Sequence, residues 1–171
     1  MKLSRRHFLA ATGLVAAAST ALAAGGLAAS WWDAPADAPL HVLSDEEAEI
    51  LDALAEAIHP EGGDPAIGGR RARCGRACDT VMQGLVPTQA KLLKVAIHAL
   101  DALPVVTHGA RLRHLPTPTA TGLVRGWLRS DLAELRGVVQ SLAIFVGTAW
   151  TLHPDVQPRI AAMTRCGYGP A

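Results

Sequence analysis

The sequence predicts an all-α fold, a single compact bundle of four to five helices that follows an N-terminal signal segment. Apolar residues recur at helical spacing in several segments, and each segment is bounded by a capping residue or a proline. After the signal, no segment shows the alternation of apolar and polar residues that marks a half-buried strand. Helices with one apolar face bury that face against each other, so these observations favour a bundle.

The segment 1–29 is typical of a twin-arginine export signal. An arginine pair precedes an uncharged apolar run, and apolar side chains occupy the positions that such signals favour after the pair. The residues that carry this prediction are Arg5, Arg6, Phe8 and Leu9. The run is long enough to span a bilayer, so a plain membrane anchor is the alternative, but its many Ala and Gly residues favour a signal.

The twin-arginine route carries folded proteins, so we expect a periplasmic protein that folds, or binds its partner, before export. Small residues offer two cleavage sites, one ending at Ala23 and one ending at Ala29. If the signal is retained, the protein is associated with the membrane, and Trp31 and Trp32 suit the membrane interface.

Charged residues are divided unevenly along the rest of the chain. Residues 30–69 carry ten acidic side chains and no Lys or Arg, whereas residues 70–171 carry thirteen Lys or Arg and five acidic side chains. We expect the acidic part to lie against the basic part inside the fold, and an oppositely charged partner is the alternative. No basic run with interleaved aromatic residues is present, which argues against nucleic-acid binding.

A linker is expected over 30–43, followed by one helical domain over 44–171 that is long enough to bury a core. Ser44 and Glu47 form a capping box at the start of the first helix. Apolar residues then recur on one helix face until Pro60 ends the helix.

The other helices are bounded mainly by prolines. Pro87 opens a helix that Pro104 stops, and Pro118 suits the first turn of the next. The longest helix is expected near the C-terminus, and a short helix is expected around the first two cysteines. The expected ranges are 72–84, 87–103, 117–128, 131–152 and 156–164.

Three cysteines, Cys74, Cys78 and Cys166, allow a disulfide if the protein is exported to an oxidising compartment. The first two are four residues apart, on one side of a helical turn. A bridge between them and a bridge from Cys166 to either one are both open. The spacing matches neither haem attachment nor a common metal site.

No recognisable catalytic motif is present. The sequence lacks a nucleophile elbow, a phosphate-binding loop and a dinucleotide-binding glycine pattern. Its seven histidines show none of the spacings of common metal sites. We therefore expect no catalytic residue, no metal ligand and no cofactor in this chain.

Segments at both ends of the domain resemble a known family. The run from Leu43 to Pro65 begins with Leu-Ser-Asp-Glu-Glu, and the end contains Trp127-x-x-Ser130, His153-Pro154 and the tail Gly167-Tyr168-Gly169-Pro170. Together with the signal, this order of segments resembles the gluconate 2-dehydrogenase subunit 3 family. The chain departs from the family pattern at Cys166, where an apolar residue is more usual, and at Gln157 and Pro158, where the family often has a tryptophan.

The resemblance implies a small exported helical subunit that is not an enzyme by itself. Such subunits bind a large flavin-dependent dehydrogenase of the glucose-methanol-choline (GMC) oxidoreductase type, help it to mature as a chaperone does, and escort its export through the twin-arginine (Tat) translocase. FAD is then expected in the partner, and some complexes include a cytochrome c subunit. The expected contact residues are Trp127, Trp150, Tyr168 and Pro170, with core packing as the alternative for each tryptophan. The alternative function is a stand-alone periplasmic helical protein that binds a metal or haem through Cys and His.

Overall fold

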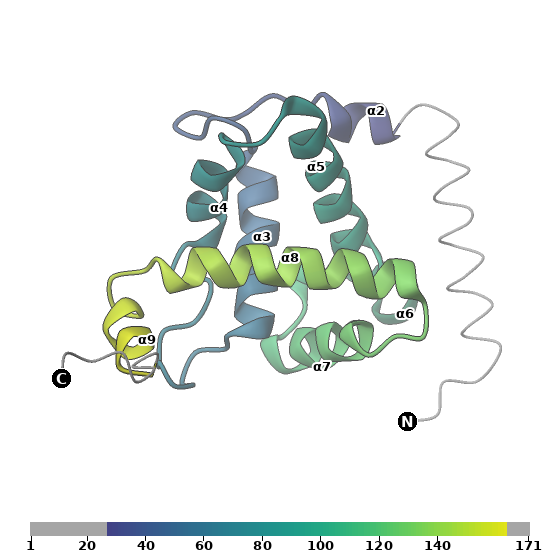
Figure 1. Cartoon of the computed structure of the whole chain (residues 1–171). Helices are drawn as coiled ribbons and strands as arrows, with labels where there is room; N and C mark the ends of the chain where they lie inside the picture. The colour runs from purple at the N-terminus through teal and green to yellow at the C-terminus, as the bar shows by residue number, and fades with distance from the viewer. Residues whose placement is uncertain (1–26, 164–171) are drawn as a thin grey trace. The chain divides into compact units, whose positions relative to one another are not determined.

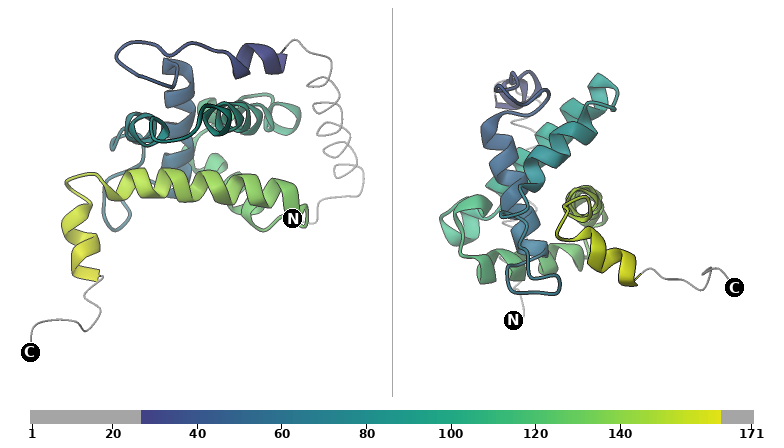
Figure 2. Two further views of the ribbon diagram at one scale, coloured as in Figure 1. Left: turned by 45° about the horizontal axis from the view of Figure 1, so that its top comes forward. Right: turned by 90° about the vertical axis from the view of Figure 1, so that its left-hand side faces the viewer.

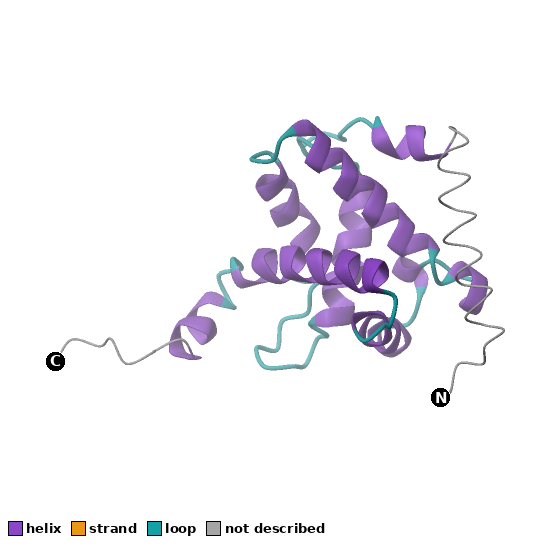
Figure 3. Ribbon diagram, turned by 45° about the vertical axis from the view of Figure 1, so that its right-hand side comes forward, coloured by secondary structure: helices purple, strands orange, loops and turns teal. Residues whose placement is uncertain are grey.

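The structure is a computed structural model that describes residues 27–163 (Figure 1). All regular elements in this part of the chain are helices and it contains no strand, which confirms the predicted all-α fold class (Figure 3). None of the described helices is both long and apolar enough to cross a bilayer. Most of the predicted signal and the tail after Met163 lie outside the described residues.

The chain divides into two units between Ala34 and Pro35. Among the described residues, the first unit holds the short helix α2 (Leu27–Trp32), which extends into the segment predicted to be a linker. The second unit holds α3 (Asp45–Ile58), α4 (Cys74–Met82), α5 (Pro87–Ala102), α6 (Val105–His108), the 3-10 helix η1 (Leu112–His114), α7 (Thr117–Leu128), α8 (Ala133–Thr151) and α9 (Gln157–Met163).

The longer helices of the second unit match the predicted ranges to within two residues at each end. The predicted capping box is present, because Ser44 Oγ accepts the backbone N–H of Glu47 at 3.2 Å and Glu47 Oε2 accepts that of Ser44 at 2.8 Å. Two elements of this unit, α6 and η1, were not predicted. Each is about one turn long, too short for apolar periodicity to reveal it.

Helix α3 is at the centre of the second unit. It packs against α4, α5, α7, α8 and η1, and Figure 1 shows α4 and α5 on either side of it while α8 crosses it. The views in Figure 2 agree that α8 lies across α3 rather than along it. The sequence predicted one apolar stripe on this helix, but residues around most of its circumference are buried. Several of these residues are alanines, which let neighbouring helices approach closely.

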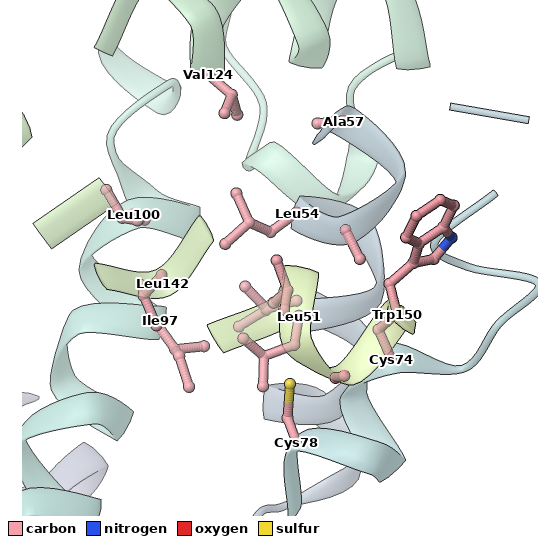
Figure 4. Close-up of a cluster of buried hydrophobic side chains, with 14 of the residues drawn as sticks. Leu51, Leu54, Ala57, Cys74, Cys78, Ile97, Leu100, Val124, Leu142 and Trp150 are labelled. Atoms are coloured by element: carbon pink, nitrogen blue, oxygen red, sulfur yellow. The ribbon is translucent and has the colours of Figure 1, made fainter. Parts of the chain in front are cut away.

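The core is built from side chains of helices that are far apart in the sequence. Leu51 and Leu54 of α3 lie among Ile97 of α5, Val124 of α7 and Leu142 of α8 (Figure 4). All five are at most 2% exposed. Burying each such side chain stabilises the fold by about 1.5 to 3 kcal/mol, so this cluster fixes the positions of the surrounding helices.

The segment before α3 is held in place by Asp79 of α4. The carboxylate of Asp79 accepts the backbone N–H groups of His41, Val42 and Leu43 at 2.8 to 3.2 Å. Lys94 of α5 donates to the carbonyl oxygen of Val42 at 3.0 Å. Burial alone would raise the pKa of Asp79, but the N–H donors hold it below its ordinary value. The segment 41–43 is therefore anchored to α4 and α5 before α3 begins.

Candidate functional site

The structure places two of the four residues that we predicted to contact a partner. Trp150 on α8 is only 6% exposed, so the core-packing alternative holds for this residue. Its indole N–H donates to the carbonyl oxygen of Ile67 at 3.0 Å, and its ring stacks on His59 with centroids 4.1 Å apart. Trp127 on α7 is half-buried and packs against the core. Tyr168, Pro170, Arg5, Arg6, Phe8 and Leu9 lie outside the described residues.

Stacking on Trp150 places His59 in a partly apolar environment at the C-terminal end of α3. Burial lowers the pKa of His59 below its ordinary value, because the charged imidazolium is less well solvated there. The imidazole is therefore neutral near pH 7. The pair of rings joins the end of α3 to α8 and is part of the core rather than a chemical site.

Cys74 and Cys78 are both free thiols buried in the core of the second unit. The structure therefore does not contain the predicted alternative of a bridge between them, and Cys166 lies outside the described residues. Burial raises the pKa of Cys74 to about 12 and that of Cys78 further still, with nearby acidic groups adding to the effect. Protonated, inaccessible thiols are poor nucleophiles and poor metal ligands. These cysteines act here as small apolar core side chains.

Three ionisable side chains form a buried charged cluster between α3 and α5. Glu47 is fully buried, and Lys94 and His98 are 4% and 5% exposed. Glu47 Oε2 lies 3.2 Å from Lys94 Nζ, and Glu47 Oε1 lies 3.2 Å from His98 Nε2. A buried carboxylate is tolerated when cationic and hydrogen-bonding groups compensate its lost hydration, so this cluster fixes how α3 sits against α5.

A second charged group lies beside this cluster and is closer to solvent. Buried Asp101 accepts the backbone N–H of Arg113 at 3.1 Å and lies 3.5 Å from Arg111. The same two arginines contact exposed Glu46 at the start of α3. Acidic residues of the first part of the domain thus pair with basic residues of the later part, which confirms the expectation drawn from the uneven charge distribution.

An apolar groove runs between α5 and α8. It has a volume of about 420 Å³, and Glu134 is its sole charged lining residue among those that the structure describes. Leu92 of α5 is 55% exposed there, and Val138 of α8 is 38% exposed. Ala133, Gly137 and Ser141 line the α8 side at intervals of four residues. Because their side chains are small, they leave room for a depression along this face of α8. We call this depression and the residues that line it the α5–α8 groove.

The α5–α8 groove was not predicted from the sequence, although a signal for it was present. Between Gly137 and Leu152 the chain has no charged residue. A surface helix normally has one polar face, so a long uncharged stretch of a helix indicates that more than one of its faces is covered or meets a partner. The apolar stripe expected on this helix includes Val138, but Val138 is 38% exposed, and Ile144, which is outside that stripe, is 71% exposed.

No group of three or more His, Cys, Asp or Glu side chains is placed to hold a metal ion among the residues that the structure describes. Comparisons of the chain with protein-family models, with curated proteins and with solved structures gave no match.

Proposed function

We propose that this chain is a non-catalytic small subunit that binds a periplasmic flavin-dependent dehydrogenase, helps it to mature and escorts its export. The twin-arginine pattern at residues 1–29 supports export in the folded state. The resemblance of both ends of the domain to the gluconate 2-dehydrogenase subunit 3 family supports a flavoprotein of the GMC type as the partner. FAD belongs to that partner in this proposal.

The observation that carries the proposal is the α5–α8 groove. Leu92 and Val138 expose apolar surface on neighbouring helices, and a contiguous exposed apolar surface is typical of a protein interface. Each Å² of this surface that a partner covers contributes about 25 cal/mol to association. A partner helix is the shape that fits a groove between two helices, because it can bury one apolar face against both walls.

The buried polar groups of the domain support a structural rather than a catalytic role for its interior. The carboxylate of Glu47 caps α3 and contacts two side chains of α5, and the carboxylate of Asp79 holds the segment before α3. Both groups are inaccessible to a substrate. Their hydrogen bonds rigidify the domain, and a rigid domain presents the groove in one shape.

The proposal is tested by purifying the affinity-tagged full chain from the periplasm of its native host. We expect a yellow complex with a flavin absorbance spectrum, a large co-purifying chain identified by mass spectrometry, and dye-linked dehydrogenase activity. Leu92→Asp should remove the large chain and the flavin, because a carboxylate in the groove opposes burial of an apolar partner surface.

Gln140→Asp is the matched control, since Gln140 is exposed on α8 outside the groove lining. We expect this variant to retain the complex. A colourless chain that purifies alone at full abundance would contradict the proposal. Equal loss of the complex in both variants would show that the partner does not bind specifically at the groove.

A further inference from the structure

A second cleft lies on another part of the domain, between α3 and the segment that leads into α4. Its volume is about 410 Å³. Its lining residues are Asp45, Glu49 and Asp52 from α3, and Arg70, Arg73 and Arg76 from the segment 70–76. We call it the α3–α4 cleft.

The spacing of the charged residues along the chain gives the cleft one acidic and one basic wall. Positions 45, 49 and 52 follow the spacing i, i+4 and i+7, which places three carboxylates on one face of α3. The three arginines follow at successive intervals of three residues, around the N-terminal end of α4. Six ionisable groups of two signs therefore converge on one cavity, three of each sign.

The two walls approach closely through the backbone. A Cβ atom added at Gly75 would lie 2.2 Å from the carbonyl oxygen of Ala48, so α3 and α4 are in contact at the edge of the cleft. The backbone N–H of Gly75 also donates to Asp52 Oδ1 at 2.7 Å. Burial raises the pKa of Asp52 to about 6, although the Gly75 N–H and the three arginines oppose this shift. These contacts hold the walls at a fixed separation.

The charges of the two walls are not neutralised by direct contact across the cleft. In the part of the chain that the structure describes, the ion pairs join other residues, such as Arg71 with Glu61 and Arg113 with Glu46. Arg70 donates from Nη2 to the carbonyl oxygen of Arg113 at 2.8 Å, a residue outside the cleft lining. Arg73 and Glu49 are both exposed and line the cleft.

A ligand with a single charge gains from one wall and is repelled by the other. A ligand with an ammonium group at one end and a carboxylate at the other gains from both walls and is oriented by them. Its carboxylate suits the planar guanidinium groups, and its ammonium group suits the carboxylates of α3. Leu40 and Ala48 also line the cleft and offer apolar contacts to a short carbon chain.

We propose that the α3–α4 cleft binds small zwitterions that carry an ammonium and a carboxylate group, the chemical class of free amino acids and short peptides. The ammonium group pairs with Glu49 and Asp45, and the carboxylate pairs with Arg73 and Arg76. This site lies apart from the α5–α8 groove and does not depend on the proposed function, because the two sets of lining residues have no member in common.

The proposal is tested by isothermal titration calorimetry on the purified full chain at low ionic strength, where surface charges are least screened. Glycine represents the free amino acids, triglycine represents the short peptides, and acetate and methylammonium carry one charge each. We expect glycine or triglycine to bind at least about tenfold more tightly than either singly charged ion, since two charge-assisted contacts replace one. The tighter of the two zwitterions identifies the length of ligand that the cleft accepts.

Arg73→Gln and Glu49→Gln should each weaken binding of that zwitterion by about tenfold, because each removes one charge-assisted contact. Arg71→Gln is the matched control, because Arg71 is exposed on the same segment but pairs with Glu61 outside the cleft lining. Circular dichroism checks that all three variants stay folded. Absence of heat with both zwitterions, equal affinity for acetate, or unchanged binding in both cleft variants would each overturn the proposal.

Discussion

The two sides of α5 contrast sharply. The side that faces α3 is charged and buried, with Lys94 and His98 against Glu47. The side that borders α8 is apolar and exposed, with Leu92 in the α5–α8 groove. A soluble domain normally shows the reverse arrangement. A buried charge is tolerated where specific contacts inside the domain compensate its lost hydration, whereas exposed apolar surface that lines a groove is typical of a site for another molecule.

The largest loss of stability is expected when the carboxylate of Glu47 is removed from the charged side of α5. Glu47→Ala takes away the group that contacts Lys94 and His98 and also removes half of the capping box of α3. We expect the free energy of unfolding to fall by about 3 to 5 kcal/mol, because two buried side chains lose their carboxylate partner. Urea unfolding of the full chain measures this loss. Glu46→Ala is the control, since Glu46 is exposed, and its effect should stay below about 1 kcal/mol.

The close contact of α3 with α4 gives the next largest effect. Gly75→Ala places a Cβ atom 2.2 Å from the carbonyl oxygen of Ala48, so the two helices must separate. We expect a loss of about 2 to 3 kcal/mol in the same urea experiment. Gly122→Ala on α7 is the control, because nothing lies within 4 Å of its added Cβ. It should stabilise the domain by about 0.5 to 1 kcal/mol, and an equal loss in both variants would disprove the close contact.

The contribution of Asp52 to stability depends on pH. The pKa of Asp52 is raised to about 6 from its ordinary value of 3.8, so the native state binds more protons than the unfolded state between these values. Stability from this group is therefore present at low pH and is lost as pH rises through about 6. Asp52→Asn keeps an acceptor for the Gly75 N–H and should stabilise the domain at pH 8 by about 1 to 2 kcal/mol. Thermal unfolding at pH 5 and pH 8 checks this, and a variant less stable than the parent at pH 8 would contradict it.

A substitution in the α5–α8 groove should have the smallest effect on stability. Val138→Thr replaces an exposed methyl group in the groove by a hydroxyl group that water can solvate. The free energy of unfolding of the isolated chain should change by less than about 0.5 kcal/mol. Urea unfolding measures it. A loss of 2 kcal/mol or more would mean that Val138 is a core residue and that the groove is closed in solution.

The sequence predicted the helices well because their signals are local. The Ser44–Glu47 capping box and the prolines at positions 87 and 104 fix helix ends through bonds and clashes within a few residues. Apolar spacing identified the core faces for the same reason. The ranges of the longer helices therefore followed from sequence alone, whereas those of α2, α6 and η1 did not.

The candidate sites were harder to predict because they depend on which helices meet. Glu47 was assigned only to the capping box, and nothing local indicates that its second oxygen contacts His98 fifty-one positions further on. The sequence left Trp150 open between partner contact and core packing, because the carbonyl of Ile67 that accepts its indole N–H comes from a distant loop. Lys94, His98 and Asp101 at i, i+4 and i+7 on α5 were a signal for a buried polar face that a closer comparison of the helices would have found.

Hydrogen–deuterium exchange tests directly whether the proposed flavoprotein partner binds at the α5–α8 groove. Exchange would be compared between the free full chain and the purified complex, with mass spectrometry at peptide resolution. The account predicts slower exchange in the complex at residues 92–96 of α5 and 133–142 of α8, with little change in α4. Protection confined to other helices, or no change anywhere in the second unit, would contradict it.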